Sequence, residues 1–322
     1  MSRSASRTAT SCPTGSSPSG RSGLRRQPTR PEAASPRRSK AMSTPLMTAQ
    51  PLGIGTLLVP VHLGAGCEHT ILFAARLAKA LSCRLIGLGA DQIELPYYGD
   101  SAGMVDAVVV ENGRAVLLED LAKAEALFRS AADGVAHEWR SAIEQTRAFL
   151  LTQSRAADLV VLPRQGPGDP PLGRMGVAPG DIVMELGRPI LVVPPGIETL
   201  AARSVVVAWK DTRESRRALQ DALPFLVRAE MVSVIAVGAD PDDDGAQDAC
   251  GYLAQYGIAA RAVLRPRSAG SIVGEITDLV RHQGADLIVA GAYGHSRLRE
   301  WIFGGVTQEL IQATPVCCLM SH

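Results

Sequence analysis

Four glycines stand in one stretch near the C-terminus, GAYGHSRLREWIFGGVTQEL: Gly291, Gly294, Gly304 and Gly305. The stretch follows the apolar run DLIVA, so it leaves a predicted strand and enters a predicted helix. Glycine in such a loop indicates a backbone that turns sharply or lies against a bulky group. A phosphate is the obvious group, because free N–H groups at a helix start, here at Gly305, Val306 and Thr307, favour an anion.

The elements that must position this loop form an internal repeat. Residues 56–90 predict a strand, a turn, an amphipathic helix and a second strand, and residues 204–239 repeat that plan. Later segments also correspond, AADLVVLPRQG with GADLIVAGAYG and RPILVVPPG with TPVCCLMSH. Strands that alternate with helices at this spacing predict a parallel sheet covered on both faces.

We therefore predict an α/β protein with two tandem, doubly wound, parallel five-stranded sheets, in domains 51–199 and 200–322. In the first domain the middle is predicted helical over 116–130 and 134–154. In the second it is predicted as a helix over 248–257, a strand over 260–264 and a helix over 271–283. Such sheets bind ligands at the carboxyl ends of the strands, where the first strand lies beside the fourth.

Residues 1–50 form a separate region rich in Ser, Arg and Pro. They carry nine Lys and Arg against one Glu and almost no large apolar side chain. Such a segment cannot bury enough surface to offset its chain entropy, so we predict a disordered tail. A transit peptide or a nucleic-acid-binding tail has a similar composition, and a start of translation at Met42 or Met47 is the alternative that we favour.

The composition of the remaining chain excludes several classes of protein. It carries 24 basic and 31 acidic residues, which argues against a nucleic-acid-binding body. Its longest apolar runs are strand-length, so we expect no membrane span. The six cysteines form no CxxC pair and no zinc-ligand spacing, and Cys317 and Cys318 should point to opposite faces of a strand. We expect a reducing, cytoplasmic location and no metal centre.

The pattern Gly291-x2-Gly294-x9-Gly304 after an apolar strand, within a tandem α/β repeat, resembles the nucleotide-binding loop of the universal stress protein family. The stretches VVVAWKDTRESRRALQDALPFL and APGDIVMELGRPILVVPP agree with that family. The resemblance covers about residues 54–321 and implies a stress-response regulatory protein that binds an adenine nucleotide. ATP, with Mg²⁺, is the cofactor that it implies.

The resemblance also assigns residues to the ligand. The adenine would lie against the first and second strand ends, which here are Ala208, Lys210, Asp211 and Val237, and Arg297 would meet the outer phosphates. The chain departs from the family at two places. Gly305 stands where the family has Ser or Thr, with Thr307 the nearest hydroxyl, and Lys210 stands where the family has Asp.

The first domain has a degenerate version of the loop, Pro163-x2-Gly166-x9-Gly176, followed by Pro179. Proline fixes φ and supplies no N–H, so we predict that any nucleotide binds the second domain alone. In the family single domains pair through their last strand, which implies an intramolecular pseudo-dimer here, with a homodimer of the whole chain as a further option.

We predict no catalytic residues, because no GxSxG, HExxH or Walker motif is present. Two alternatives to the regulatory protein stay open. One is a nucleotide hydrolase or transferase on the same scaffold, and the other is an interaction module that binds no nucleotide.

Overall fold

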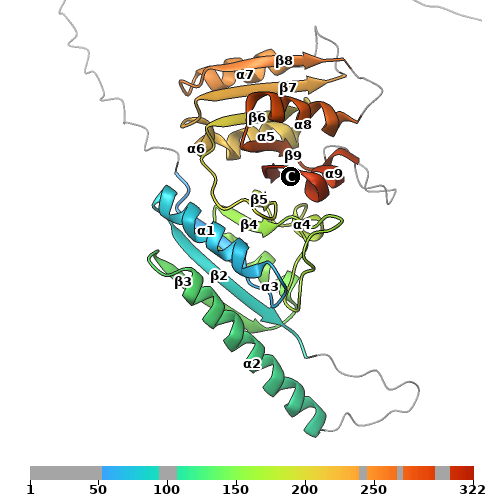
Figure 1. Cartoon of the computed structure of the whole chain (residues 1–322). Coiled ribbons are helices and arrows are strands. Elements are labelled where there is room, and N and C mark those ends of the chain that lie inside the picture. The colour runs from blue at the N-terminus through green and yellow to red at the C-terminus, as the bar shows by residue number, and fades with distance from the viewer. Residues whose placement is uncertain (1–52, 94–106, 239–244, 267–270, 294–304) are drawn as a thin grey trace, which may run out of the picture. The chain divides into compact units, whose positions relative to one another are not determined.

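The structure, a computed structural model, describes five stretches of the chain (Figure 1): residues 53–93, 107–238, 245–266, 271–293 and 305–322. The tail that the sequence predicts to be disordered lies outside them. Residues from Ala49 to the C-terminus form one compact unit. We call residues 51–199 the first half and residues 200–322 the second half.

The first half contains five strands joined by helices. In chain order its elements are β1 (Thr56–Pro60), α1 (Cys67–Leu81), β2 (Arg84–Asp91), α2 (Ala107–Ala131), β3 (His137–Ile143), α3 (Thr146–Gln153), the 3₁₀ helix η1 (Ser154–Ala156), β4 (Leu159–Pro163), α4 (Pro179–Ile182) and β5 (Ile190–Val193).

The second half repeats the five strands. Its elements are β6 (Ser204–Trp209), α5 (Arg213–Asp221), α6 (Leu223–Leu226), β7 (Met231–Val237), α7 (Ala246–Ala254), β8 (Ala260–Arg265), α8 (Ile272–Gln283), β9 (Leu287–Gly291), α9 (Gly305–Ala313) and β10 (Cys317–Ser321). Thr212 caps α5 by accepting a hydrogen bond from Ser215 N.

The ten strands of the described residues form one sheet in the order β3-β2-β1-β4-β5-β10-β9-β6-β7-β8. Pairing within each half is parallel, and the fold is the predicted doubly wound α/β arrangement. The halves meet where β5 pairs antiparallel with β10, with Leu191 opposite Leu319. In each half the first strand lies beside the fourth, β1 against β4 and β6 against β9.

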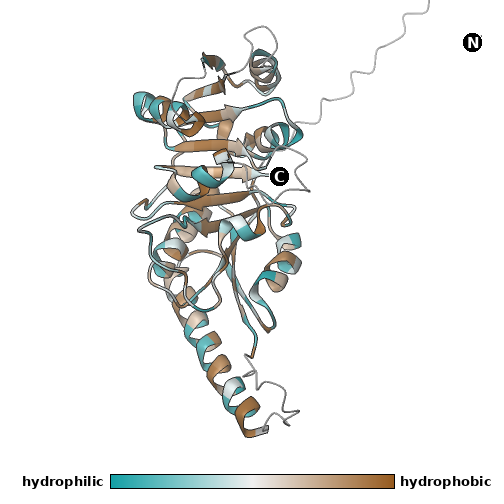
Figure 2. Ribbon diagram, turned by 90° about the vertical axis from the view of Figure 1, so that its right-hand side faces the viewer, coloured by the Kyte–Doolittle hydropathy of each residue, from teal (hydrophilic) through white to brown (hydrophobic). Residues whose placement is uncertain are grey.

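Two apolar layers bury the two faces of this sheet, and Figure 2 shows the strands as its most apolar elements. Side chains from α1, α2, α5, α6 and α7 cover one face, and those from α3, α4, α8 and α9 cover the other. Alternate residues of β10 therefore enter different layers, with Cys317 on one face and Cys318 on the other. Burial raises the pKa of both thiols, so each behaves as a small apolar side chain.

The predicted helical middle of the first half is wrong in part. Residues 137–143 form strand β3, and the helix that follows starts only at Thr146. The sequence HEWRSAI lacks the apolar run of a buried strand, because β3 is an edge strand whose side chains are half-buried or exposed. Gly134, at a φ of 79°, stands between α2 and β3. The predicted strand over 260–264 is confirmed as β8.

The β5–β10 seam gives a first prediction. Leu319 is fully buried, so Leu319→Ala should lower the free energy of unfolding by about 2–5 kcal/mol through lost burial and a cavity. Urea titration of both proteins measures this difference. The matched control is Leu118→Ala on α2, whose side chain is 48% exposed and whose loss should cost less than about 0.5 kcal/mol. Equal costs for the two variants would contradict a buried seam.

Candidate functional site

The carboxyl ends of β6, β7 and β9 lie side by side at one edge of the sheet. Ala208 on β6 pairs with Ala290 on β9 and with Ile235 on β7. Ala208 therefore lies next to the end of β9, and Lys210 and Asp211 follow shortly after it in the chain. Val237 ends β7, the next strand in the sheet.

Gly291, the last residue of β9, has a packing role that explains its type. A Cβ atom placed there would lie 2.6 Å from the backbone nitrogen of Ser215 and 2.7 Å from the carbonyl carbon of Glu214. Those atoms belong to the first turn of α5, which crosses the strand end. Glycine at 291 is thus required by the approach of a helix, whereas the sequence suggested the approach of a ligand.

The start of α9 contains the predicted phosphate-binding residues Gly305, Val306 and Thr307. The Thr307 hydroxyl is buried and accepts a hydrogen bond from the Tyr293 N–H at 3.0 Å, which joins the second residue after β9 to the first turn of α9. Gly305 is exposed, and no described atom lies within 4 Å of a Cβ placed on it. Gly294, Arg297 and Gly304 lie outside the described residues.

Charged side chains surround this edge. Asp211 forms an ion pair with Arg216, one turn into α5, and Arg213 forms one with Glu214. Both Lys210 and Asp211 are exposed. The carboxylate that follows β6 is thus paired with an arginine, and the lysine stands at the rim of the sheet edge.

The corresponding edge of the first half is covered by that half's own loop. The Leu63 N–H donates to the Arg174 carbonyl at 3.0 Å. The backbones of Gly64 and Gly173 approach so closely that a Cβ on Gly64 would lie 2.3 Å from the Gly173 nitrogen. The residues after β4 therefore cross the residues after β1, at the place where the first strand lies beside the fourth.

Ion pairs hold this crossing in place. The Arg174 guanidinium contacts Asp91 at the end of β2 at 2.9 Å and Asp120 on α2 at 2.8 Å. The loop of the first half therefore differs from that of the second half in more than its prolines, because it also crosses the residues after β1. That the first half binds no nucleotide stays a prediction. Sequence reasoning missed Arg174, because an isolated arginine in a loop carries no signal of its partners.

The start of the same loop is anchored to the second half. Arg164 binds Asp169 through two nitrogens, at 2.9 and 2.6 Å, and donates a third hydrogen bond to the Thr314 carbonyl at 2.8 Å. A Cβ on Gly166 would lie only 1.8 Å from the Gln312 carbonyl oxygen at the end of α9. Hydrogen bonding from Arg164 holds the pKa of the Asp169 carboxyl below its ordinary value.

Two absences hold for the described part of the chain. No helix within it is long and apolar enough to cross a membrane. Within the same stretches, no three His, Cys, Asp or Glu side chains gather as metal ligands would. The cytoplasmic location stays a prediction.

Comparison with known proteins first defines the class of fold. A universal stress protein from Archaeoglobus fulgidus, in its crystal structure, matches 83% of this chain over 95% of its own length, with 14% identity and a TM-score of 0.59. A shorter solved structure, a universal stress protein in complex with cAMP, matches 44% of this chain over 98% of its own, with 17% identity and a TM-score of 0.31. With a TM-score of 0.31, this likeness says nothing about a ligand of the present chain. The first likeness shows the fold of a universal stress protein across both halves.

The family follows from the sequence comparisons. Residues 202–322 match the model of the universal stress protein family. Universal stress protein Slr1230 of Synechocystis sp. is 24% identical over 152 residues, which are 45% of this chain and 50% of that protein. The chain thus spans half the length of this curated relative. The model match identifies residues 202–322 as a universal stress protein domain.

The packing role of Gly291 is testable without a ligand. Gly291→Ala should lower the free energy of unfolding by about 1–3 kcal/mol, because its Cβ would overlap the backbone of α5. Gly305→Ala is the control, since no described atom lies within 4 Å of a Cβ at that position and alanine favours a helix. Thermal unfolding of both variants without nucleotide measures the difference. A Gly291→Ala protein as stable as the Gly305→Ala protein would contradict the steric reading.

The Arg164–Asp169 pair predicts a pH dependence. Asp169→Asn should lower the free energy of unfolding by about 1–3 kcal/mol at neutral pH, because its buried carboxylate accepts from Arg164 and from Gly166 N. The folded pKa is lowered, so this stabilisation is complete above about pH 5 and is lost as the pH falls through the folded pKa.

Denaturant titrations over that pH range measure the gap between wild type and the Asn variant, which should shrink on acidification. Asp278→Asn serves as the control, since this carboxylate on α8 is exposed although it pairs with Arg281. It should change stability by less than about 0.5 kcal/mol at every pH. A difference in the free energy of unfolding between wild type and Asp169→Asn that grows toward low pH would contradict the prediction.

Proposed function

We propose that the protein is a stress-response regulatory protein that binds one adenine nucleotide, ATP with Mg²⁺, in its second half. The adenine would lie against Ala208, Lys210, Asp211 and Val237. The phosphates would lie beside Gly291 and the start of α9, with Arg297 at the outer phosphate. The universal stress protein domain over residues 202–322 supports the regulatory role.

One observation carries the choice of the second half. In the first half, residues 173 and 174 cover Leu63 and Gly64 just after β1, which favours the second half as the place of a nucleotide. In the second half, Gly305 starts a nine-residue helix with no described atom within 4 Å of its Cβ position. The free N–H groups and the positive dipole end of a helix start favour an anion.

The same proposal includes the assignment of 51–199 and 200–322 as two domains that pair within one chain. Their support is the antiparallel pairing of β5 with β10. Each half's last strand thereby has a partner without a second copy of the chain. A homodimer of the whole protein is not needed to cover these strands.

Calorimetric titration of the full chain with ATP, ADP and AMP, with and without Mg²⁺, tests the proposal. We expect one molecule bound per chain. Gly305→Glu should weaken ATP binding by at least about tenfold, because its carboxylate would repel the phosphates. Glutamate at a helix start stabilises the helix, so lost binding would not reflect unfolding. The control is Gly251→Glu on α7, an exposed helical glycine that also has open space around it.

The other outcomes separate the alternatives. Two molecules per chain, or equal effects of Gly305→Glu and Gly251→Glu, would overturn the site. Saturable ATP turnover would indicate the hydrolase or transferase, and absence of binding by the intact chain would indicate the interaction module.

A further inference from the structure

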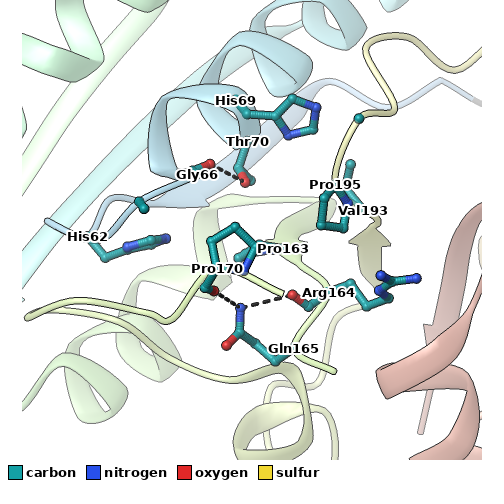
Figure 3. A pocket seen from close by; sticks show the side chains of 12 residues that line it. His62, Gly66, His69, Thr70, Pro163, Arg164, Gln165, Pro170, Val193 and Pro195 are labelled. Atoms are coloured by element: carbon teal, nitrogen blue, oxygen red, sulfur yellow. Dashed lines mark hydrogen bonds between the residues drawn. The ribbon is translucent and has the colours of Figure 1, made fainter. Parts of the chain in front are cut away.

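A second candidate site lies in the first half, on the α1 side of the sheet. A cavity of about 260 Å³ opens between the end of β1, the start of α1, the residues after β4 and those after β5. Its walls include Pro163, Pro170, Val193 and Pro195, which are apolar, together with two histidines, His62 and His69 (Figure 3). The cavity lies beside the crossing of residues 63–64 by 173–174, since His62 and Ala65, on either side of that crossing, both line it.

The His62 ring places at the cavity an N–H group that has no hydrogen-bond acceptor among the described residues. Its side chain is only 4% exposed, and Figure 3 shows the ring pointing toward Pro163 and Pro170. The Gly64 N–H donates to Nδ1 at 3.0 Å, so the neutral ring carries its proton on Nε2. Burial lowers the pKa of His62, which keeps the ring neutral near pH 7. Within the described residues Nε2 has no hydrogen-bond partner.

A buried donor left without an acceptor costs free energy, so a group that supplies the acceptor would bind favourably. The Nε2 of His69, from the first turn of α1, is also buried and finds no partner among the described residues. The cavity faces the start of this 15-residue helix, where Gly66 is the N-cap and no side chain caps it. Oxygen acceptors are therefore favoured by two features of the wall, the His62 ring and the helix end.

The charges on the wall limit what the ligand can be. Arg164 also lines the cavity, but Asp169 and the Thr314 carbonyl occupy its guanidinium. A polyphosphate would find no unpaired cation among the lining residues, so a nucleoside triphosphate does not fit. A metal ion does not fit His62 either, because Nε2 could ligate only if the proton moved to Nδ1, against the Gly64 N–H.

We propose that this cavity binds a small ring compound that presents a carbonyl or carboxylate oxygen to the Nε2–H of His62. The ring packs between the prolines and Val193, and the oxygen accepts from the imidazole. Pro163 and Pro170, which belong to the degenerate loop of the first half, thus form part of the apolar wall of a different site. This site is independent of nucleotide binding by the second half.

Histidine imidazole NMR on the full chain tests the proposal with benzamide, benzoate and benzene as probes. We expect benzamide or benzoate to shift the His62 Nε2 resonance saturably, with a Kd on the order of 1 mM or tighter. Binding of benzamide alone would identify a neutral carbonyl as the acceptor, and binding of benzoate alone a carboxylate. Benzene lacks an acceptor and should bind at least about tenfold more weakly.

Variants separate the donor from the cavity. His62→Phe should weaken binding of the oxygen-bearing probe by about tenfold, and His62→Gln, which keeps an N–H near the same place, should weaken it less. His282→Phe on the exposed face of α8 is the control and should change nothing. If His62→Phe fails to fold, the comparison of benzamide and benzoate with benzene on the unaltered chain carries the test. Equal binding of benzene, full binding by His62→Phe, or no saturable shift up to on the order of 10 mM would overturn the proposal.

Discussion

The pairing of β5 with β10 is the constraint on which the rest of the structure depends. Both strands are buried at every position and on both faces. Such a strand cannot stand at the edge of a sheet in water, because its apolar faces and its unpaired backbone groups would both be exposed. Antiparallel pairing of the two last strands solves this within one chain. The same pairing brings Gly166 of the first half against Gln312 at the end of α9.

The pairing also gives the loops after β4 and after β9 different surroundings, although the two have similar glycine spacing. The loop after β4 lies where it can reach the second half, and Arg164 and Gly166 contact the end of α9. Farther along, Gly173 and Arg174 turn back over the residues after β1. Between these two attachments Pro170 borders a cavity. One segment therefore joins the halves, covers an edge of the sheet and forms the wall of a pocket.

The sequence predicts the fold well because its signals are local and repeated. Alternating apolar strands and amphipathic helices, present twice, are enough to predict a doubly wound sheet. The sequence does not predict the edge strand β3, because its half-buried residues, HEWRSAI, contain no apolar run. In the candidate site, positions such as Ala208 and Gly291 are predictable because a strand end is predictable.

The reasons for the residue types are less predictable. Gly291 reads as a ligand residue until the backbone of α5 is seen 2.6 Å from its Cβ position. The tautomer of His62 depends on Gly64, whose backbone is held by Gly173 more than a hundred residues away. Contacts between segments distant in the chain leave no mark in the local pattern.

The attachment of Arg164 to the Thr314 carbonyl has an evolutionary consequence. In a symmetric dimer of identical subunits each substitution appears twice, so both copies of a loop must serve the same purpose. Here the two loops are separate stretches of one polypeptide. Selection can alter the residues around Arg164 while leaving 291–307 untouched, and the reverse also holds. Joining the copies end to end thus permits one half to specialise as the other half's scaffold, a division of labour that exact symmetry forbids.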